Sequence, residues 1–123
     1  MKFVISMIIN PALLEALTDE EQAAIGAGHE AFIAGLKESG ELITTLALID
    51  PSQAAVVTVR NGQTVATDGP FVEAKEFLGG FYLVDCESRE RAIELAARIP
   101  DAKIEGLGVE VRQVMFADGS LEA

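Results

Sequence analysis

The chain has 123 residues, is 50% hydrophobic and carries a formal net charge of -11. This length accommodates a single domain with a real hydrophobic core, which we expect to span residues 1–123. So acidic a chain disfavours nucleic-acid binding, because neutralising a phosphate backbone requires clustered lysines and arginines.

The cysteine content and the first residues indicate a cytoplasmic protein without membrane association. Cys86 is the only cysteine, so no intrachain disulfide can form. The opening stretch MKFVISMIINP is interrupted at Asn10-Pro11, too early for a signal peptide or a membrane span. We therefore expect a location in the reducing cytoplasm.

The first third of the chain predicts a strand followed by a long helix. Residues 2–9, KFVISMII, are apolar on both alternating faces, which is typical of a central strand. The capping-box sequence at residues 18–21, TDEE, predicts a helix that ends near Gly40. The apolar stripe of this helix comprises Ile25, His29, Phe32, Ile33 and Leu36.

The middle of the chain predicts a strand and a β-hairpin. Residues 42–49 are typical of a second strand, and Asp50-Pro51-Ser52 of a turn. Two β-rich segments, 54–60 and 63–67, flank Asn61-Gly62, the dipeptide that a type I′ hairpin turn favours because both central residues need a positive φ.

The last third predicts a strand, a helix and a final strand. Residues 77–86, FLGGFYLVDC, indicate a buried strand. Ser88 is a suitable N-cap for a helix that runs through Ile99 and stops at Pro100. Residues 108–116 alternate like a last strand, and residues 117–123 form a flexible tail.

This order predicts a ferredoxin-like α+β fold, an antiparallel sheet with two helices on one face and an inserted hairpin. The strands are apolar on both faces: we assign Val4 and Tyr82 to one face, and Phe3, Ile5 and Phe81 to the other. The helices cover only one of these faces. We therefore expect a homodimer packed sheet to sheet, with a small-molecule site near the covered mouth.

His29, the only histidine, is the first candidate for chemistry. Its unperturbed pKa lies near neutrality, and the helical stripe directs it toward the sheet, where a carboxylate could fix its tautomer. The alternative is a structural imidazole hydrogen-bonded to the backbone. Asp68 is the candidate carboxylate, with the alternative that it only stabilises the turn Asp68-Gly69-Pro70.

Further candidates for ligand binding surround this turn and the later strands. Phe71 and the charged residues Lys75 and Glu76 follow Asp68 in a loop that must pack onto the body, although the charges also fit a solvated surface pair. Tyr82 is either a core residue or a hydroxyl donor in a pocket. Arg112 could hold an anion or pair with its same-face neighbour on the last strand.

No motif for a metal or cofactor is present. One histidine and one cysteine give no metal-binding spacing, and no GxSxG elbow or phosphate-binding glycine loop occurs. We expect neither a metal nor a cofactor.

Several of these segments together resemble the DGPF branch of the YCII-related family. The resemblance rests on residues 68–71, DGPF, followed by Lys75-Glu76, Gly79-Gly80 and Glu110-Val111-Arg112, and it covers Phe3 to about Met115. It implies a dimeric ferredoxin-like α/β barrel and a site with a histidine and an aspartate, matched here by His29 and Asp68. It also implies an association with extracytoplasmic-function sigma factors.

Three functional hypotheses follow. In the first, His29 and Asp68 catalyse elimination or hydrolysis of a small molecule by acid–base chemistry, and Lys75 or Arg112 holds an anionic substrate. In the second, the chain is a non-catalytic ligand-binding or regulatory module that works with a sigma factor. In the third, the DGPF motif serves only the fold.

Overall fold

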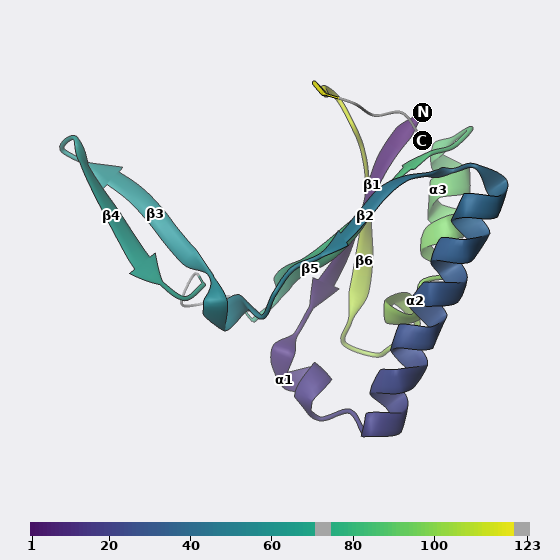
Figure 1. The fold of residues 1–123 in the computed structure, drawn as a ribbon, viewed down its shortest axis with the longest axis horizontal. Helices are drawn as coiled ribbons and strands as arrows, with labels where there is room; N and C mark the ends of the chain where they lie inside the picture. Colours follow the sequence, from purple (N-terminus) through teal and green to yellow (C-terminus); the bar gives the residue numbers. More distant parts are fainter. Residues whose placement is uncertain (71–74, 120–123) are drawn as a thin grey trace.

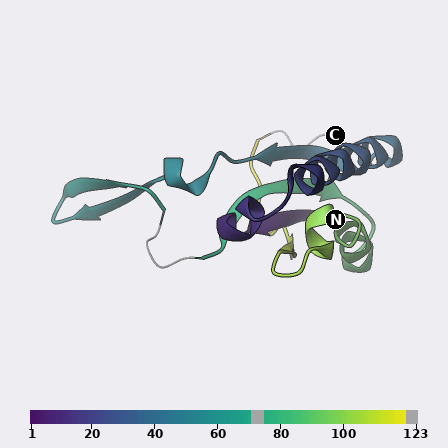
Figure 2. The same ribbon diagram turned by 90° about the horizontal axis from the view of Figure 1, so that it is seen from below.

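The computed structural model of the protein describes residues 1–70 and 75–119. Its centre is an antiparallel four-stranded sheet in the order β2-β5-β1-β6, and a separate two-stranded sheet is formed by β3 and β4. The strands are β1 (Lys2–Ile9), β2 (Leu42–Ala47), β3 (Ala55–Arg60), β4 (Gln63–Asp68), β5 (Phe77–Asp85) and β6 (Gly108–Gln113). Two helices, α2 (Asp19–Ser39) and α3 (Arg89–Ala96), cover one face of the larger sheet (Figures 1 and 2). The predicted ferredoxin-like α+β fold is confirmed.

Helix α2 begins and ends where the capping signals predict. The Thr18 hydroxyl accepts a hydrogen bond from the Glu21 amide, and the Glu21 carboxylate accepts one from the Thr18 amide. Gly40 closes the helix in the left-handed conformation, with φ 77°, which glycine adopts without steric cost. Phe32 and Leu36 are buried against the sheet. The predicted orientation of this helix is therefore confirmed.

The hairpin β3–β4 projects away from the larger sheet, at the end of the molecule opposite α2 (Figure 1). Its turn has φ 51° at Asn61 and φ 76° at Gly62, the two positive values that a type I′ turn requires. A short 3-10 helix, η1 (Pro51–Gln53), precedes it. The hairpin prediction is thus confirmed, and nearly all of its residues are exposed.

Several predicted boundaries differ from the structure: β2 ends at Ala47 rather than at residue 49, and β6 ends at Gln113 rather than at residue 116. Asn10 ends β1 as expected, but its side chain also caps a short helix, α1 (Pro11–Glu15), because it accepts from two amides of the first turn. Helix α3 stops at Ala96 rather than at Ile99, and the chain then forms the 3-10 helix η2 (Pro100–Lys103). Proline fits the first position of this turn because that position needs no amide donor.

The assignment of strand faces also needs correction. The register pairs Phe3 with Val84 and Ile5 with Tyr82, so these four residues share one face. This face carries the core beneath the helices, which also includes Phe32, Leu36, Leu95 and Ile99. Tyr82 therefore lies on the face opposite Val4, because residues directly opposite each other in an antiparallel pair point to the same side.

The opposite face of the sheet carries no helix (Figure 2). Val4 pairs with Leu83, and Leu46 pairs with Phe81, so all four belong to this helix-free face. Both faces are thus apolar, as predicted, although their composition differs from the predicted one. None of the helices in the described part of the chain is long and apolar enough to cross a membrane.

Candidate functional site

His29 lies at the centre of a hydrogen-bonded network between α2, β5 and η2. Its Nδ1 is 2.6 Å from the hydroxyl oxygen of Tyr82, and its Nε2 is 2.7 Å from Oδ1 of Asp101. Asp101 is only 6% exposed and Tyr82 only 2%. The His29 side chain retains 23% of its accessible surface. The His29 side chain is therefore partly open to solvent, whereas its two partners are almost completely buried.

Local structure explains how the three side chains meet. The apolar periodicity of α2 directs His29 toward the sheet, and alternation along β5 directs Tyr82 toward the helices. Pro100 starts η2 and packs against Gly28, where an added Cβ would clash with the proline ring. The close approach of η2 to α2 at Gly28 brings the next residue, Asp101, to the imidazole.

The hydrogen bonds define the tautomer of the neutral His29 imidazole. An ionised carboxylate only accepts hydrogen bonds, so Nε2–H of His29 donates to Asp101. In the neutral imidazole, Nδ1 then accepts from the Tyr82 hydroxyl; in the imidazolium, Nδ1–H donates to it. The buried carboxylate fixes the tautomer and stabilises the positive charge that forms when Nδ1 takes up a proton.

Tyr82 acts in this network as a hydroxyl group, not as a phenolate. Burial raises its pKa to about 12, and the nearby negative charge of Asp101 contributes to the same shift. The phenol ring is also fixed by its neighbours. It stacks on His29 with an interplanar angle of 9°, and Phe32 meets it edge-on at a centroid distance of 4.9 Å.

The other carboxylate predicted for this site, Asp68, does not lie beside His29. It ends β4, in the projecting hairpin, and its side chain makes no hydrogen bond or ion pair with a described residue. The backbone of the next residue anchors the segment, because the Gly69 amide donates to the Ala54 carbonyl over 2.6 Å. Within one chain, Asp101 thus takes the position beside the imidazole that the sequence suggested for Asp68.

The remaining candidates are dispersed. Lys75 and Glu76 are exposed residues that precede β5, and Phe71 lies outside the described residues. Arg112 forms an ion pair with Glu110 on β6, as the sequence alternative predicted. Of the suggested ligand-binding residues that the structure describes, Tyr82 alone is in contact with His29.

Comparison with known families identifies the family of this domain. The sequence profile of the YCII-related domain matches residues 1–117. This chain belongs to the YCII-related family. It is also 36% identical over 85 residues to an uncharacterised protein of Rhizobium meliloti (strain 1021), an alignment that covers 68% of each chain.

In this YCII-related domain, Asp101 is the site residue that sequence reasoning missed. Pro100 was expected only to end a helix, and no role was predicted for the residue after it. A signal was nevertheless present: a proline at the start of a turn often precedes an acidic residue that interacts with the free amides. Only the packing of η2 on Gly28 reveals that Asp101 turns to His29 instead.

Other reactive groups of the YCII-related domain lie apart from this network. Burial raises the pKa of the Cys86 thiol, whose sulfur donates to the Ser88 carbonyl, so the thiol stays protonated at neutral pH. Within residues 1–70 and 75–119, no cluster of three or more histidine, cysteine, aspartate or glutamate side chains could hold a metal ion.

Proposed function

We propose that the protein is a small-molecule enzyme in which His29 transfers a proton and Asp101 orients it. The observation that carries this proposal is the imidazole held at 2.7 Å from a buried carboxylate while 23% of its side chain remains exposed. A purely structural histidine in a core needs no access to solvent. An oriented, accessible imidazole is the usual general base of enzymes.

The geometry suggests how such a step would proceed. A substrate C–H or a water molecule gives its proton to Nδ1 of His29, displacing the Tyr82 hydroxyl from that nitrogen. Asp101 stabilises the imidazolium that forms, through its hydrogen bond to Nε2. In an elimination, His29 subsequently returns the proton to the leaving group. In a hydrolysis, the deprotonated water attacks the substrate, the bond to the leaving group breaks, and His29 gives its proton to that group.

Proton nuclear magnetic resonance in D2O tests this proposal on a broad panel of candidate substrates. Wild-type protein is incubated with pooled small carbonyl, lactone and halogenated compounds, and exchange of C–H signals or the appearance of products is followed. We expect at least one compound to react with the wild type and none with His29→Gln. Equal reactivity of folded His29→Gln would refute the role of His29, and a wild type inert toward every pool would count against an enzyme of this kind.

We further propose that the protein functions as a homodimer in the cytoplasm. Leu46 on the helix-free face is 42% exposed, and Met115 and Phe116 beyond β6 are 99% and 79% exposed. Exposed apolar side chains of this kind favour association of two copies of the chain. Light scattering of the purified protein should give twice the chain mass of 13.0 kDa, and the substitution Leu46→Glu should shift it toward the monomer.

A second candidate function is a non-catalytic regulatory module, and the projecting hairpin favours it. Val57, Val59 and Val65 are 61%, 66% and 47% exposed, and an isolated two-stranded hairpin is marginally stable unless it packs on something else. The resemblance to the DGPF branch suggests an extracytoplasmic-function sigma factor as the partner. Co-purification with a co-expressed sigma factor, lost when residues 55–68 are replaced by a short linker, would support this candidate; no co-purification would refute it.

A further inference from the structure

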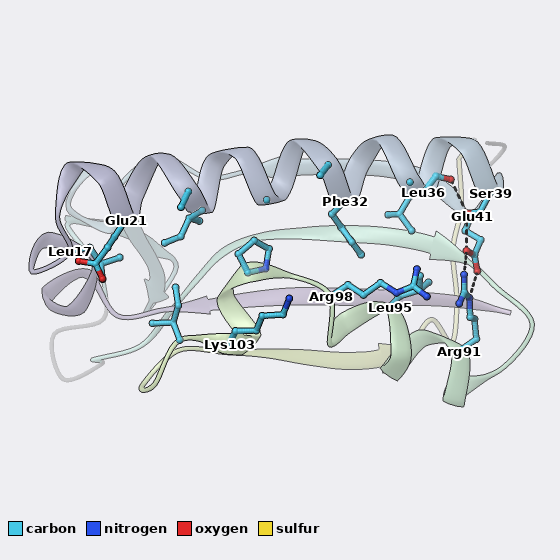
Figure 3. A pocket seen from close by; sticks show the side chains of 17 residues that line it. Leu17, Glu21, Phe32, Leu36, Ser39, Glu41, Arg91, Leu95, Arg98 and Lys103 are labelled. Atoms are coloured by element: carbon cyan, nitrogen blue, oxygen red, sulfur yellow. Dashed lines mark hydrogen bonds and ion pairs between the residues drawn. The ribbon is translucent and has the colours of Figure 1, made fainter.

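An elongated groove runs between α2 and the segment formed by α3 and η2 (Figure 3). Its volume of about 650 Å³ lies within the range of roughly 300–1,000 Å³ that is usual for small-molecule sites. One wall is the side of α2 that faces α3 and η2, with Phe32 and Leu36 directed into the groove; the other carries Arg91, Arg98 and Lys103. Neither His29 nor Asp101 lines it.

The charge of this groove is unusual for so acidic a chain. The sequence contains 9 lysines and arginines against 20 acidic residues, yet Arg91, Arg98 and Lys103 all line this one groove. The two acidic residues that line it, Glu21 and Glu41, are already engaged. Glu21 accepts from the backbone of Thr18, and Glu41 accepts from two nitrogens of Arg91.

Two of the three cations retain donors for a ligand. Arg98 donates through Nη2 to Glu94, and its other guanidinium nitrogens have no hydrogen-bond partner among the described residues. Lys103 has no ion pair within residues 1–70 and 75–119. Figure 3 shows the Lys103 amino group and the Arg98 side chain along the same wall of the groove. Both side chains therefore remain available to an anionic group in the groove.

The opposite wall gives space for an apolar body. Small residues recur along the groove side of α2 at Ala24, Ala31 and Gly35, whereas Pro100 fills the space beside Gly28. A Cβ added at Gly35 would meet nothing within 4 Å, so the protein itself does not fill this position. Apolar surface beside unengaged cations fits a molecule that is apolar over most of its length and anionic at one end.

From these observations we propose that the α2–α3 groove binds a small amphipathic carboxylate, with its apolar part along α2 and its carboxylate at Arg98 and Lys103. The site is separate from His29 and stands independently of the proposed acid–base function. A hydrophobic groove alone would accept a neutral or a cationic amphiphile equally well. The arrangement of cations instead predicts a preference for the anion.

Titration of isotopically labelled protein with octanoate, 1-octanol and octylamine, each below its aggregation threshold, tests this proposal. We expect octanoate to shift the amide resonances of the groove residues Ala31, Gly35 and Lys103 in a saturable manner, and to bind at least about tenfold more tightly than protonated octylamine. Shifts confined to other parts of the protein, or equal affinity for the two charged amphiphiles, would overturn the proposal.

Matched variants separate the two halves of the site. Lys103→Gln should weaken octanoate binding by about tenfold, whereas Arg89→Gln, which removes the same charge from an exposed position on α3 outside the groove, should leave it unchanged. Gly35→Leu should block binding by filling the groove, and Gly26→Leu, at an open position of α2 that does not line it, should not. Unchanged affinity in both Lys103→Gln and Gly35→Leu would exclude the groove as the binding site.

Discussion

Nε2 of His29 lies 2.7 Å from Oδ1 of Asp101, although 72 positions separate the two residues in the chain. The contact joins the middle of α2 to η2, which begins at Pro100, beyond the end of α3 at Ala96. The pair therefore combines two functions in one place. It attaches the α3–η2 segment to the long helix, and it fixes the tautomer of the single histidine.

The substitution Asp101→Asn tests the structural half of this pair. Removing the buried negative charge leaves Nε2–H with a weaker acceptor, so we expect the free energy of unfolding to fall by roughly 1–3 kcal/mol. Urea denaturation followed by circular dichroism measures this change. The matched substitution Asp68→Asn, in the exposed hairpin, should alter stability by less than about 0.5 kcal/mol. A larger loss for Asp68→Asn would support the hypothesis that the DGPF motif serves the fold.

Tyr82 should titrate far above the usual pH of a phenol. The chain contains one tyrosine and no tryptophan, so phenolate absorbance reports on Tyr82 alone. Because its pKa in the folded protein is about 12, against 10.0 for the unperturbed group, the absorbance should stay low at pH 10 to 11 and rise at once when the protein is unfolded by urea. An absorbance midpoint near pH 10 in the folded state would contradict the burial of this hydroxyl.

The same shift has a consequence for stability. The pKa of Tyr82 is raised on folding, so the stabilisation is complete below pH 10 and is lost as the pH rises from about 10 to 12, where only the unfolded chain releases the proton. A shift of this size corresponds to about 2–3 kcal/mol across that window. Urea denaturation of the wild type and of Tyr82→Phe at several alkaline pH values measures it. The variant lacks the ionisable group and should show a shallower decline.

The sequence predicted the fold more completely than the site, for a physical reason. Local chemistry determines the capping box at Thr18, the left-handed Gly40 and the turn at Asn61-Gly62, and all three were found where they were predicted. The inward orientation of His29 also follows from the period of its own helix. These features depend on residues close to one another in the chain.

The hydrogen-bond partner of His29 could not be predicted from residues close to it in the chain. The imidazole meets Asp101 only because η2 packs on the bare backbone at Gly28, a contact between segments far apart in sequence. The predicted assignment of residues to the two faces of the sheet was wrong for a similar reason. The pairing of Ile5 with Tyr82 and the register shift between Met7 and Ile8 depend on how two strands align, which alternation within single strands does not determine.

Glu41 and Arg91 should stabilise the junction of α2 and α3 in a pH-dependent manner. Two hydrogen bonds of 2.9 and 3.0 Å join them, and the Arg91 guanidinium lowers the pKa of the Glu41 carboxyl below its usual value of 4.5. The contribution is therefore present above the pKa of an unfolded glutamate and is lost as the pH falls through the lower pKa of the folded protein. Because the pair is partly exposed, we expect it to contribute less than about 1 kcal/mol.

The comparison of Glu41→Gln with Glu38→Gln checks this contribution. Glu38 is an exposed residue in the last turn of α2, close in sequence to Glu41, and it has no ion pair among the described residues. Denaturation at pH 7 should show Glu41→Gln to be less stable than Glu38→Gln, and the difference should narrow as the pH is lowered below 4. A difference that persists unchanged in acid would show that the carboxylate charge is not its source.

Gly28 and Gly26 provide the sharpest test of how η2 is positioned. Both lie inside the continuous helix α2. Replacing an exposed helical glycine by alanine normally adds about 1 kcal/mol to the free energy of unfolding. At Gly26 the new Cβ meets nothing within 4 Å, so Gly26→Ala should be stabilising by about that amount.

At Gly28 the new Cβ would clash with Cγ of Pro100, so η2 must move away and carry Asp101 with it. We therefore expect Gly28→Ala to lose the helix-propensity gain and to weaken the His29–Asp101 hydrogen bond. Thermal denaturation measures the first effect and the ¹⁵N shifts of the imidazole measure the second. Equal stabilisation by the two substitutions, with an unchanged imidazole spectrum in both, would show that the packing of Pro100 on Gly28 does not hold Asp101 in place.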